Sequence, residues 1–201
     1  MDFTIIIQAF WLVIPIYVAN ASAVIVGGGT PIDFNKTYHD GRRLLGDGKT
    51  WRGLLTGTFI GMTAGFGLSI VAVYINSSEY SYLHVATFEG FPLMIPILFS
   101  LCNGALLGDI IESFFKRRIG KKRGEDWYIF DQLDFILGAL FFTFLISGLL
   151  HLSGVMSTNW FLQTFTIWHI LILIIVTPFI HITANILNKK LRSKQAKTYK
   201  T

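Results

Sequence analysis

The sequence predicts an all-α integral membrane protein with five transmembrane helices, an external N-terminus and a cytoplasmic C-terminus. Of its 201 residues, 52% are hydrophobic and 14% are charged, and the mean hydropathy is +0.55. A soluble domain usually carries about 25% charged residues. Five nearly uncharged apolar segments of about 20 residues are each long enough to cross a hydrocarbon core of about 30 Å.

The predicted spans follow one another along residues 1–187, which we expect to form one membrane-embedded domain. The first segment starts with Met-Asp, lacks a basic region before it and is longer than the apolar part of a signal peptide, so we interpret it as a retained span. Residues 188–201 are expected to be a basic cytoplasmic tail. The five spans are Phe3–Val26, Leu54–Ile75, Phe91–Ile111, Asp131–Leu152 and Phe161–Leu187.

The distribution of Lys and Arg predicts the orientation. All 17 fall in the segment between the first two spans, the segment between the third and fourth, and the tail. Alternating spans place these three segments on one side of the membrane, and basic loops stay in the cytoplasm. The opposite loops contain Glu79 and Glu89 but no cation, so an anion-binding site is expected on the cytoplasmic side.

Carboxylates at the cytoplasmic ends of the third and fourth spans form the first candidate site. Asp109, Glu112 and Lys116 lie at helical spacing on one face, and Asp131 and Asp134 lie on one side of the first turn of the fourth span. Acids that converge there favour a hard cation, and Mg²⁺ takes oxygen ligands. Two alternatives remain open: a helix-capping role for Asp131 and a salt bridge between Glu112 and Lys116.

The second candidate is the polar segment Leu45–Gly53, directly before the second span. Its glycines permit tight turns around Asp47, while Lys49 and Arg52 supply positive charge near a helix N-terminus, as an anion site requires. The spacing is not that of a Walker loop, and an ordinary turn at a helix start is the alternative.

Other features have simpler interpretations. Glycines recur every four residues from Gly53 to Gly65, which favours close packing of the second span against a neighbouring helix, in the same chain or in a homodimer. Asn20, within the first span, is a candidate for hydrogen bonding to a helix or a ligand. The single Cys102 cannot form an internal disulfide, and no Cys and His cluster has the spacing of a zinc site.

Acids able to hold Mg²⁺, together with many cations at a membrane interface, fit phosphoryl or nucleotidyl transfer, in which a protein mainly positions groups and stabilises charge. The sequence has no arrangement typical of a covalent nucleophile. Two other classes stay open: a small ion or solute transporter that uses the acids as a relay, and a lipid phosphatase or a phosphotransferase with another head group.

The motifs around these acids resemble a known enzyme family. Ser113-Phe-Phe-Lys116-Arg117, followed by Lys122 and then Asp131-Gln-Leu-Asp134, is similar to the signature of the CTP-dependent phosphatidate cytidylyltransferases, S-x-x-K-R-x(4)-K-D with a later D-R-x-D. Arg123 and Gln132 depart from that pattern, and its His-Gly-Gly is lacking.

The chain is more similar to the archaeal branch, the CDP-archaeol synthases, through Pro15–Asn20 and Gly46–Gly53. This resemblance implies an enzyme of the plasma membrane, with its active site on the cytoplasmic side. Such an enzyme joins CTP to 2,3-di-O-geranylgeranylglyceryl 1-phosphate with Mg²⁺ and releases pyrophosphate. A CDP-diacylglycerol synthase acting on phosphatidate is the alternative.

The resemblance also implies residue roles. It assigns the metal to Asp109, Asp131 and Asp134, with Lys116 completing the catalytic set. The expected partners are CTP, an isoprenoid glycerophosphate lipid, membrane lipids and, in a homodimer, a second copy of the chain; no nucleic acid is expected. The candidate nucleotide- and phosphate-binding residues are Asn20, Asp47, Lys49, Arg52, Arg117 and Lys122.

Overall fold

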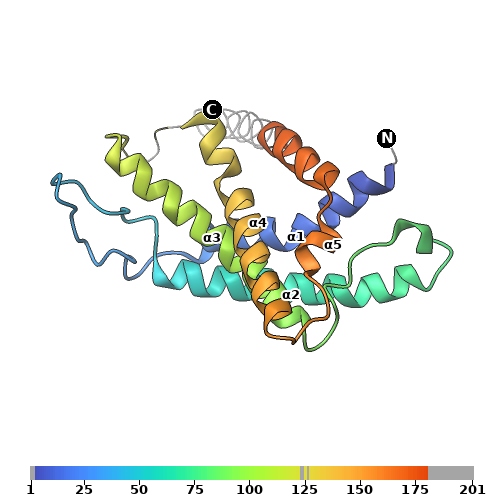
Figure 1. The fold of residues 1–201 in the computed structure, drawn as a ribbon. Coiled ribbons are helices and arrows are strands. Elements are labelled where there is room, and N and C mark those ends of the chain that lie inside the picture. Colours follow the sequence, from blue (N-terminus) through green and yellow to red (C-terminus); the bar gives the residue numbers. More distant parts are fainter. Residues whose placement is uncertain (1–2, 123–124, 126, 181–201) are drawn as a thin grey trace, which may run out of the picture.

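The computed structural model describes residues 3–122, 125 and 127–180, and within them the chain is helical (Figure 1). Outside the helices, strand-type pairing in these residues is limited to two isolated β-bridges, Pro31 with Thr50 and Thr37 with Arg43. The last helix runs over Ile167–Ile180. The elements before it are α1 (Phe3–Val26), α2 (Trp51–Asn76), η1 (Ser81–Leu83), α3 (Met94–Arg118), α4 (Tyr128–Leu152) and α5 (Trp160–Thr164).

Four helices, α1 to α4, are long and apolar enough to cross a membrane. They correspond to the first four predicted spans. The Thr50 side chain accepts a hydrogen bond from the Gly53 N–H and so caps α2, which therefore begins at Trp51 rather than Leu54. α3 continues past Ile111 to Arg118, because basic residues in a last turn are favoured by the helix dipole.

The fifth predicted span, Phe161–Leu187, is not one continuous helix. α5 ends at Thr164, Phe165 is extended, and a new helix begins at Ile167. The Asn159 side chain caps the start of α5. The ring of His169 accepts a hydrogen bond from the Thr166 N–H and so caps the start of the last helix. Residues 181–187 and the predicted tail 188–201 lie outside the described residues.

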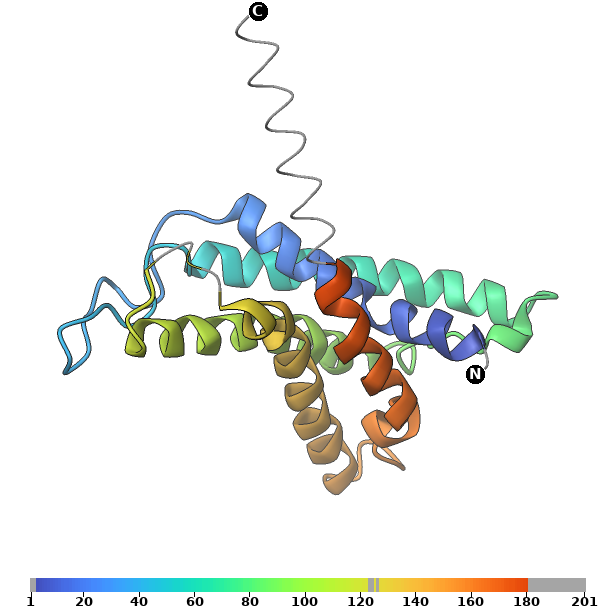
Figure 2. The ribbon, with the colours of Figure 1, turned by 90° about the horizontal axis from the view of Figure 1, so that it is seen from above.

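The glycine face of α2 packs against α1 in the same chain. A Cβ added at Gly57 would lie 2.8 Å from that of Ala23, and one at Gly61 would lie 2.6 Å from that of Ala19. The two helices run side by side over much of their length (Figure 2). Because α1 covers this face, a homodimer would have to use another surface.

α3 and α4 approach each other even more closely where they cross (Figure 1). A Cβ at Gly138 of α4 would lie 2.5 Å from the carbonyl oxygen of Gly104 and 2.6 Å from the Cα of Gly108, both on α3. Only glycine permits such an approach of two backbones. The crossing places the C-terminal half of α3 beside the first turns of α4, where the predicted acids lie.

Candidate active site at the α3–α4 crossing

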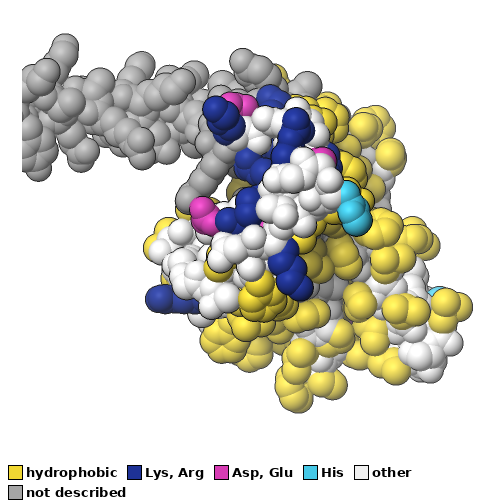
Figure 3. All heavy atoms as spheres, turned by 90° about the vertical axis from the view of Figure 1, so that its left-hand side faces the viewer, with side chains coloured by type: hydrophobic (Ala, Val, Ile, Leu, Met, Phe, Trp, Pro, Cys, Tyr) yellow, Lys and Arg dark blue, Asp and Glu magenta, His cyan; other side chains and the backbone are white. Residues whose placement is uncertain are grey.

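A polar cavity of about 250 Å³ lies where the segment 45–49 meets α3 and the start of α4. Lys and Arg side chains gather on the end of the molecule that carries it, as Figure 3 shows. The wall therefore combines segments that are far apart in the sequence. Its residues are Leu45, Gly46, Asp47, Gly48, Lys49, Asp109, Glu112, Ser113, Lys116, Arg117, Asp131 and Asp134.

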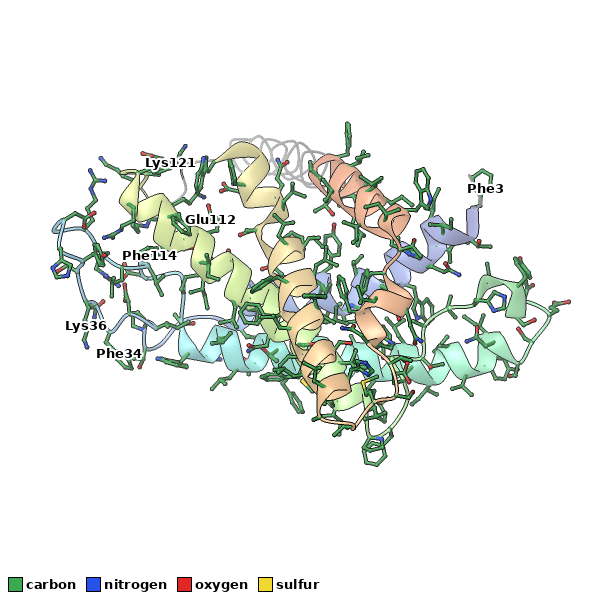
Figure 4. All side chains as sticks on the ribbon, in the orientation of Figure 1. Phe3, Phe34, Lys36, Glu112, Phe114 and Lys121 are labelled. Atoms are coloured by element: carbon green, nitrogen blue, oxygen red, sulfur yellow. The ribbon has the colours of Figure 1, made fainter. Side chains whose placement is uncertain are left out.

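Three carboxylates converge in this cavity. Asp109, Glu112 and Asp134 each offer an oxygen, and these oxygens lie within 4.8 Å of one another. Asp109 and Glu112 share a face of α3 at i and i+3, and Glu112 lies on the stretch of α3 that runs beside the start of α4 (Figure 4). Asp134 comes from α4, next to the glycine crossing. This all-oxygen set suits a hard divalent cation such as Mg²⁺.

Two lysines form ion pairs with three of the four acids. The Lys49 ammonium lies 2.5 Å from Asp109, which links the segment before α2 directly to the carboxylate cluster. The Lys116 ammonium lies 2.7 Å from Asp131 and 3.3 Å from Glu112. The salt bridge between Glu112 and Lys116, which the sequence left open, is therefore present.

Asp131 has a different environment from the three clustered acids. Besides its ion pair with Lys116, its carboxylate accepts a hydrogen bond of 2.8 Å from the N–H of Trp127, at the start of α4. It thus satisfies a free backbone donor of the first turn, as the capping alternative proposed. Of the predicted metal ligands, the structure brings Asp109 and Asp134 together, with Glu112 as the third member and Asp131 beside them.

Glu112 was absent from the predicted metal set, although its helical spacing from Asp109 was the signal that pointed to it. Hydropathy does not tell that Glu112, as well as Asp109, turns toward Asp134. The helix crossing decides that, and the Gly108 contact that sets it joins residues from two spans.

The predicted nucleotide-binding residues divide into two groups. Asp47, Lys49 and Arg117 line the cavity, and the Arg117 guanidinium also donates to the Leu45 carbonyl oxygen at 3.2 Å. The others lie outside the wall: exposed Arg52 at the start of α2, exposed Lys122, whose backbone N–H donates to Glu125, and half-buried Asn20 on α1.

Asp33, which the sequence did not single out, organises the segment that carries Lys49. Its side chain is fully buried and accepts hydrogen bonds from the Arg43 guanidinium, at 2.8 and 3.1 Å, and from the N–H groups of Asn35, Leu45 and Gly46. Burial alone would raise the pKa of Asp33, but these donors outweigh it and hold that pKa well below its usual range. Because Arg43 follows ten positions later in an aperiodic segment, no helical or strand pattern reveals the pair.

The same segment is fastened to the C-terminal end of α3. Arg42 donates to the Arg118 carbonyl oxygen at 2.7 Å, which satisfies a free acceptor of the last turn. In return the Arg118 guanidinium donates to Asp40 at 2.8 Å and lies 4.7 Å from the ring centre of Tyr38. The segment before α2 is thereby held against α3 on the cavity side.

Comparison with known proteins identifies the family. The family model described as CDP-archaeol synthase, CarS-like, matches residues 3–198. The chain belongs to the CDP-archaeol synthase family. The resemblance carried by the acid motifs and by the segment Gly46–Gly53 is thus confirmed.

Relatives within the CDP-archaeol synthase family are similar over most of their length. The CDP-archaeol synthase of Methanosarcina barkeri is 40% identical over 181 residues, covering 87% of this chain and 93% of the relative. That of Pyrococcus horikoshii is 38% identical over 190 residues, covering 94% and 95%.

A solved structure described as an intramembrane enzyme for archaeal membrane lipids biosynthesis is 33% identical to this chain. It superposes with a TM-score of 0.67 over 90% of this chain and 94% of that one. Together with the four apolar helices, this likeness supports the predicted multi-pass, all-helical membrane fold.

Proposed function

We propose that this protein transfers CMP from CTP to the phosphate of 2,3-bis-O-geranylgeranyl-sn-glycerol 1-phosphate, giving CDP-archaeol and pyrophosphate in membrane lipid biosynthesis. Family membership supports both substrates. One observation carries the chemistry: Asp109, Glu112 and Asp134 converge in a cavity that Lys49 and Lys116 also enter. Carboxylates for a metal and cations for phosphates are the parts that nucleotidyl transfer needs.

The reaction forms one bond and breaks one. An oxygen of the lipid phosphate attacks the α-phosphorus of CTP in line, and the bond from that phosphorus to the oxygen bridging to the β-phosphate breaks, so that pyrophosphate leaves. A phosphate monoester is already largely ionised at neutral pH, its second pKa being about 6. The protein therefore supplies no general base.

The metal, Mg²⁺ in our proposal, would be held by Asp109, Glu112 and Asp134, with Asp131 adjoining. When bound, it supplies charge neutralisation and orientation for the phosphate oxygens. The residues of the wall do the rest. Lys49 exchanges its contact with Asp109 for one with the triphosphate, while Lys116 keeps Asp131 oriented toward the cavity.

We infer that the cavity faces the cytoplasm at the plasma membrane, with the N-terminus outside and with the helix that begins at Ile167, rather than the whole predicted segment, as the fifth span. All 17 Lys and Arg fall in three segments that alternating spans place on one side. The close contact between Arg42, before α2, and Arg118, at the end of α3, is consistent with that placement. CTP would then enter from the cytoplasm and the lipid from the bilayer. A homodimer stays a prediction, which a mass measurement in detergent checks.

The function is tested with purified protein, Mg²⁺, labelled CTP and the geranylgeranyl lipid phosphate. We expect the wild type to form labelled CDP-lipid and pyrophosphate in equal amounts, and Asp109→Asn to lose at least about 100-fold in rate, as removal of a charge-stabilising group does. No CDP-lipid from the wild type, or an undiminished rate in the variant, would refute the scheme.

Two further experiments distinguish the proposed function from a CDP-diacylglycerol synthase and from a transporter. Phosphatidate offered in competition with the ether lipid should be used less well, and preferential use of phosphatidate would indicate a CDP-diacylglycerol synthase. Sealed vesicles containing the protein should show no ion flux coupled to the acids. Flux without pyrophosphate release would favour a transporter.

A further inference from the structure

We propose that Asp33, which lies behind the wall of the cavity, is a positioning residue for the nucleotide, holding segment 45–49 in the shape that receives the triphosphate. Because this role presumes that the protein uses CTP as proposed above, its test must distinguish the two. Asp33 does not line the cavity, and among the described residues its carboxylate makes no hydrogen bond or ion pair with α3 or with the clustered acids.

The hydrogen bonds around Asp33 require a carboxylate. One of its oxygens accepts from Arg43 and the Asn35 N–H, and the other accepts from Arg43 and the Leu45 and Gly46 N–H groups. All of these partners are donors. An amide in the same place would turn an NH₂ group toward at least two of them, whichever way it is flipped.

Three links connect Asp33 to the cavity. Leu45 and Gly46, whose N–H groups it accepts from, themselves line the cavity, and Gly46 has φ 106°, a conformation suited to glycine. The other terminal nitrogen of the Arg43 guanidinium, Nη1, donates to Asp47, another wall residue, at 2.9 Å. At the far end of the segment, the N–H of Ile32, next to Asp33, donates to the Lys49 carbonyl oxygen at 2.9 Å.

The Asp33 carboxylate therefore anchors the start of the segment that presents Lys49 to the cavity, while the backbone of the preceding Ile32 holds its end. The acids on α3 and α4 are positioned separately, by the glycine crossing. Loss of the Asp33 carboxylate should consequently disturb the contact with CTP and leave the path of the lipid unchanged. A residue that merely stabilised the fold would not separate the two substrates.

The experiment compares Asp33→Asn with Asp40→Asn, a matched change in the same segment. The Arg118 guanidinium and the Arg42 N–H both donate to one oxygen of Asp40, which an amide oxygen can replace, and in the described part of the chain Asp40 makes no hydrogen bond or ion pair with residues 45–49. We expect Asp33→Asn to raise the KM for CTP and the Kd of labelled CTP about 10- to 100-fold, because a displacement of segment 45–49 by about 1 Å has an effect of this size. The KM for the lipid should stay within about twofold of wild type. Asp40→Asn should stay within about twofold in all three values.

Arg43→Lys is the second variant, because Asp33→Asn risks misfolding. Lysine keeps the charge but cannot donate to both oxygens of Asp33 and to Asp47 at once, so a smaller rise in the KM for CTP is expected. Wild-type CTP constants in both variants, or an equal loss for CTP and lipid, would overturn the positioning role. If the wild type itself formed no CDP-lipid, the proposed function would fail instead.

Discussion

Replacing Gly138 by alanine tests whether the crossing of α3 and α4 assembles the carboxylate cluster. The added Cβ would lie 2.5 Å from the Gly104 carbonyl oxygen and 2.6 Å from the Gly108 Cα, whereas ordinary contact begins at 3.4 Å. Both obstructing atoms belong to the backbone, so the two helices must separate by about 1 Å. Asp134 on α4 would move away from Asp109 and Glu112 by a similar amount.

Two effects are expected from this separation of the helices, a loss of stability and a loss of catalytic rate. Overpacking of this kind costs about 1–3 kcal/mol of stability. A misplacement of about 1 Å in a catalytic arrangement costs about 100-fold in rate. We therefore expect Gly138→Ala to lower the thermal midpoint in detergent and to reduce CDP-lipid formation about 100-fold, with the larger change in kcat.

Gly67→Ala is the matched control, since it is also a glycine in the middle of a transmembrane helix. A Cβ there meets no atom within 4 Å. Its activity should equal that of the wild type, and its stability should be unchanged or up to about 1 kcal/mol higher. A Gly138→Ala protein with wild-type rate and midpoint would refute the view that this contact sets the geometry of the site.

Three further results follow from the same structure. Titration with Mn²⁺, followed by its magnetic resonance signal, should show a larger loss of affinity for Glu112→Gln than for Asp131→Asn, because Glu112 belongs to the carboxylate cluster; the reverse order would return Asp131 to the metal set. Lys49→Ala should raise the KM for CTP about 10-fold, since it removes a cation that enters the cavity, and steady-state kinetics with an unchanged KM would contradict that role. The depressed pKa of Asp33 contributes stability in full above about pH 4, its unfolded value, and that contribution is lost as the pH falls toward the lower folded pKa. The difference in thermal midpoint between wild type and Asp33→Asn should therefore shrink below pH 4, and a constant difference would exclude the ionised carboxylate as its source.

Much of the fold could be predicted from the sequence, because the lipid environment strongly restricts the structures that a chain can form in it. A backbone in hydrocarbon must satisfy its own hydrogen bonds, so long apolar segments become helices. α1 has the predicted bounds, and α4 differs only at its first residues. The break before Ile167 was missed, because hydropathy averages over the local caps that the Asn159 and His169 side chains provide.

The candidate site was partly accessible for a different reason. Charged groups are costly near the bilayer, so Asp109 and Asp134 stood out from their apolar surroundings. Asp33 did not, because it lies in a polar segment where acids are common, and only its pairing with Arg43 in three dimensions distinguishes it. Contacts of this kind depend on how an aperiodic segment folds back on itself, which periodicity does not describe.

The wall of the cavity spans the chain from Leu45 to Asp134, and this has a consequence for biogenesis. A ribosome that has released only the first three helices into the membrane has made every lysine of the site but lacks the partner carboxylates of α4. Such a nascent chain would hold Lys116 without Asp131 and Asp109 without Asp134. The cavity wall is thus completed in a single step, when the fourth helix leaves the translocon and docks on the third.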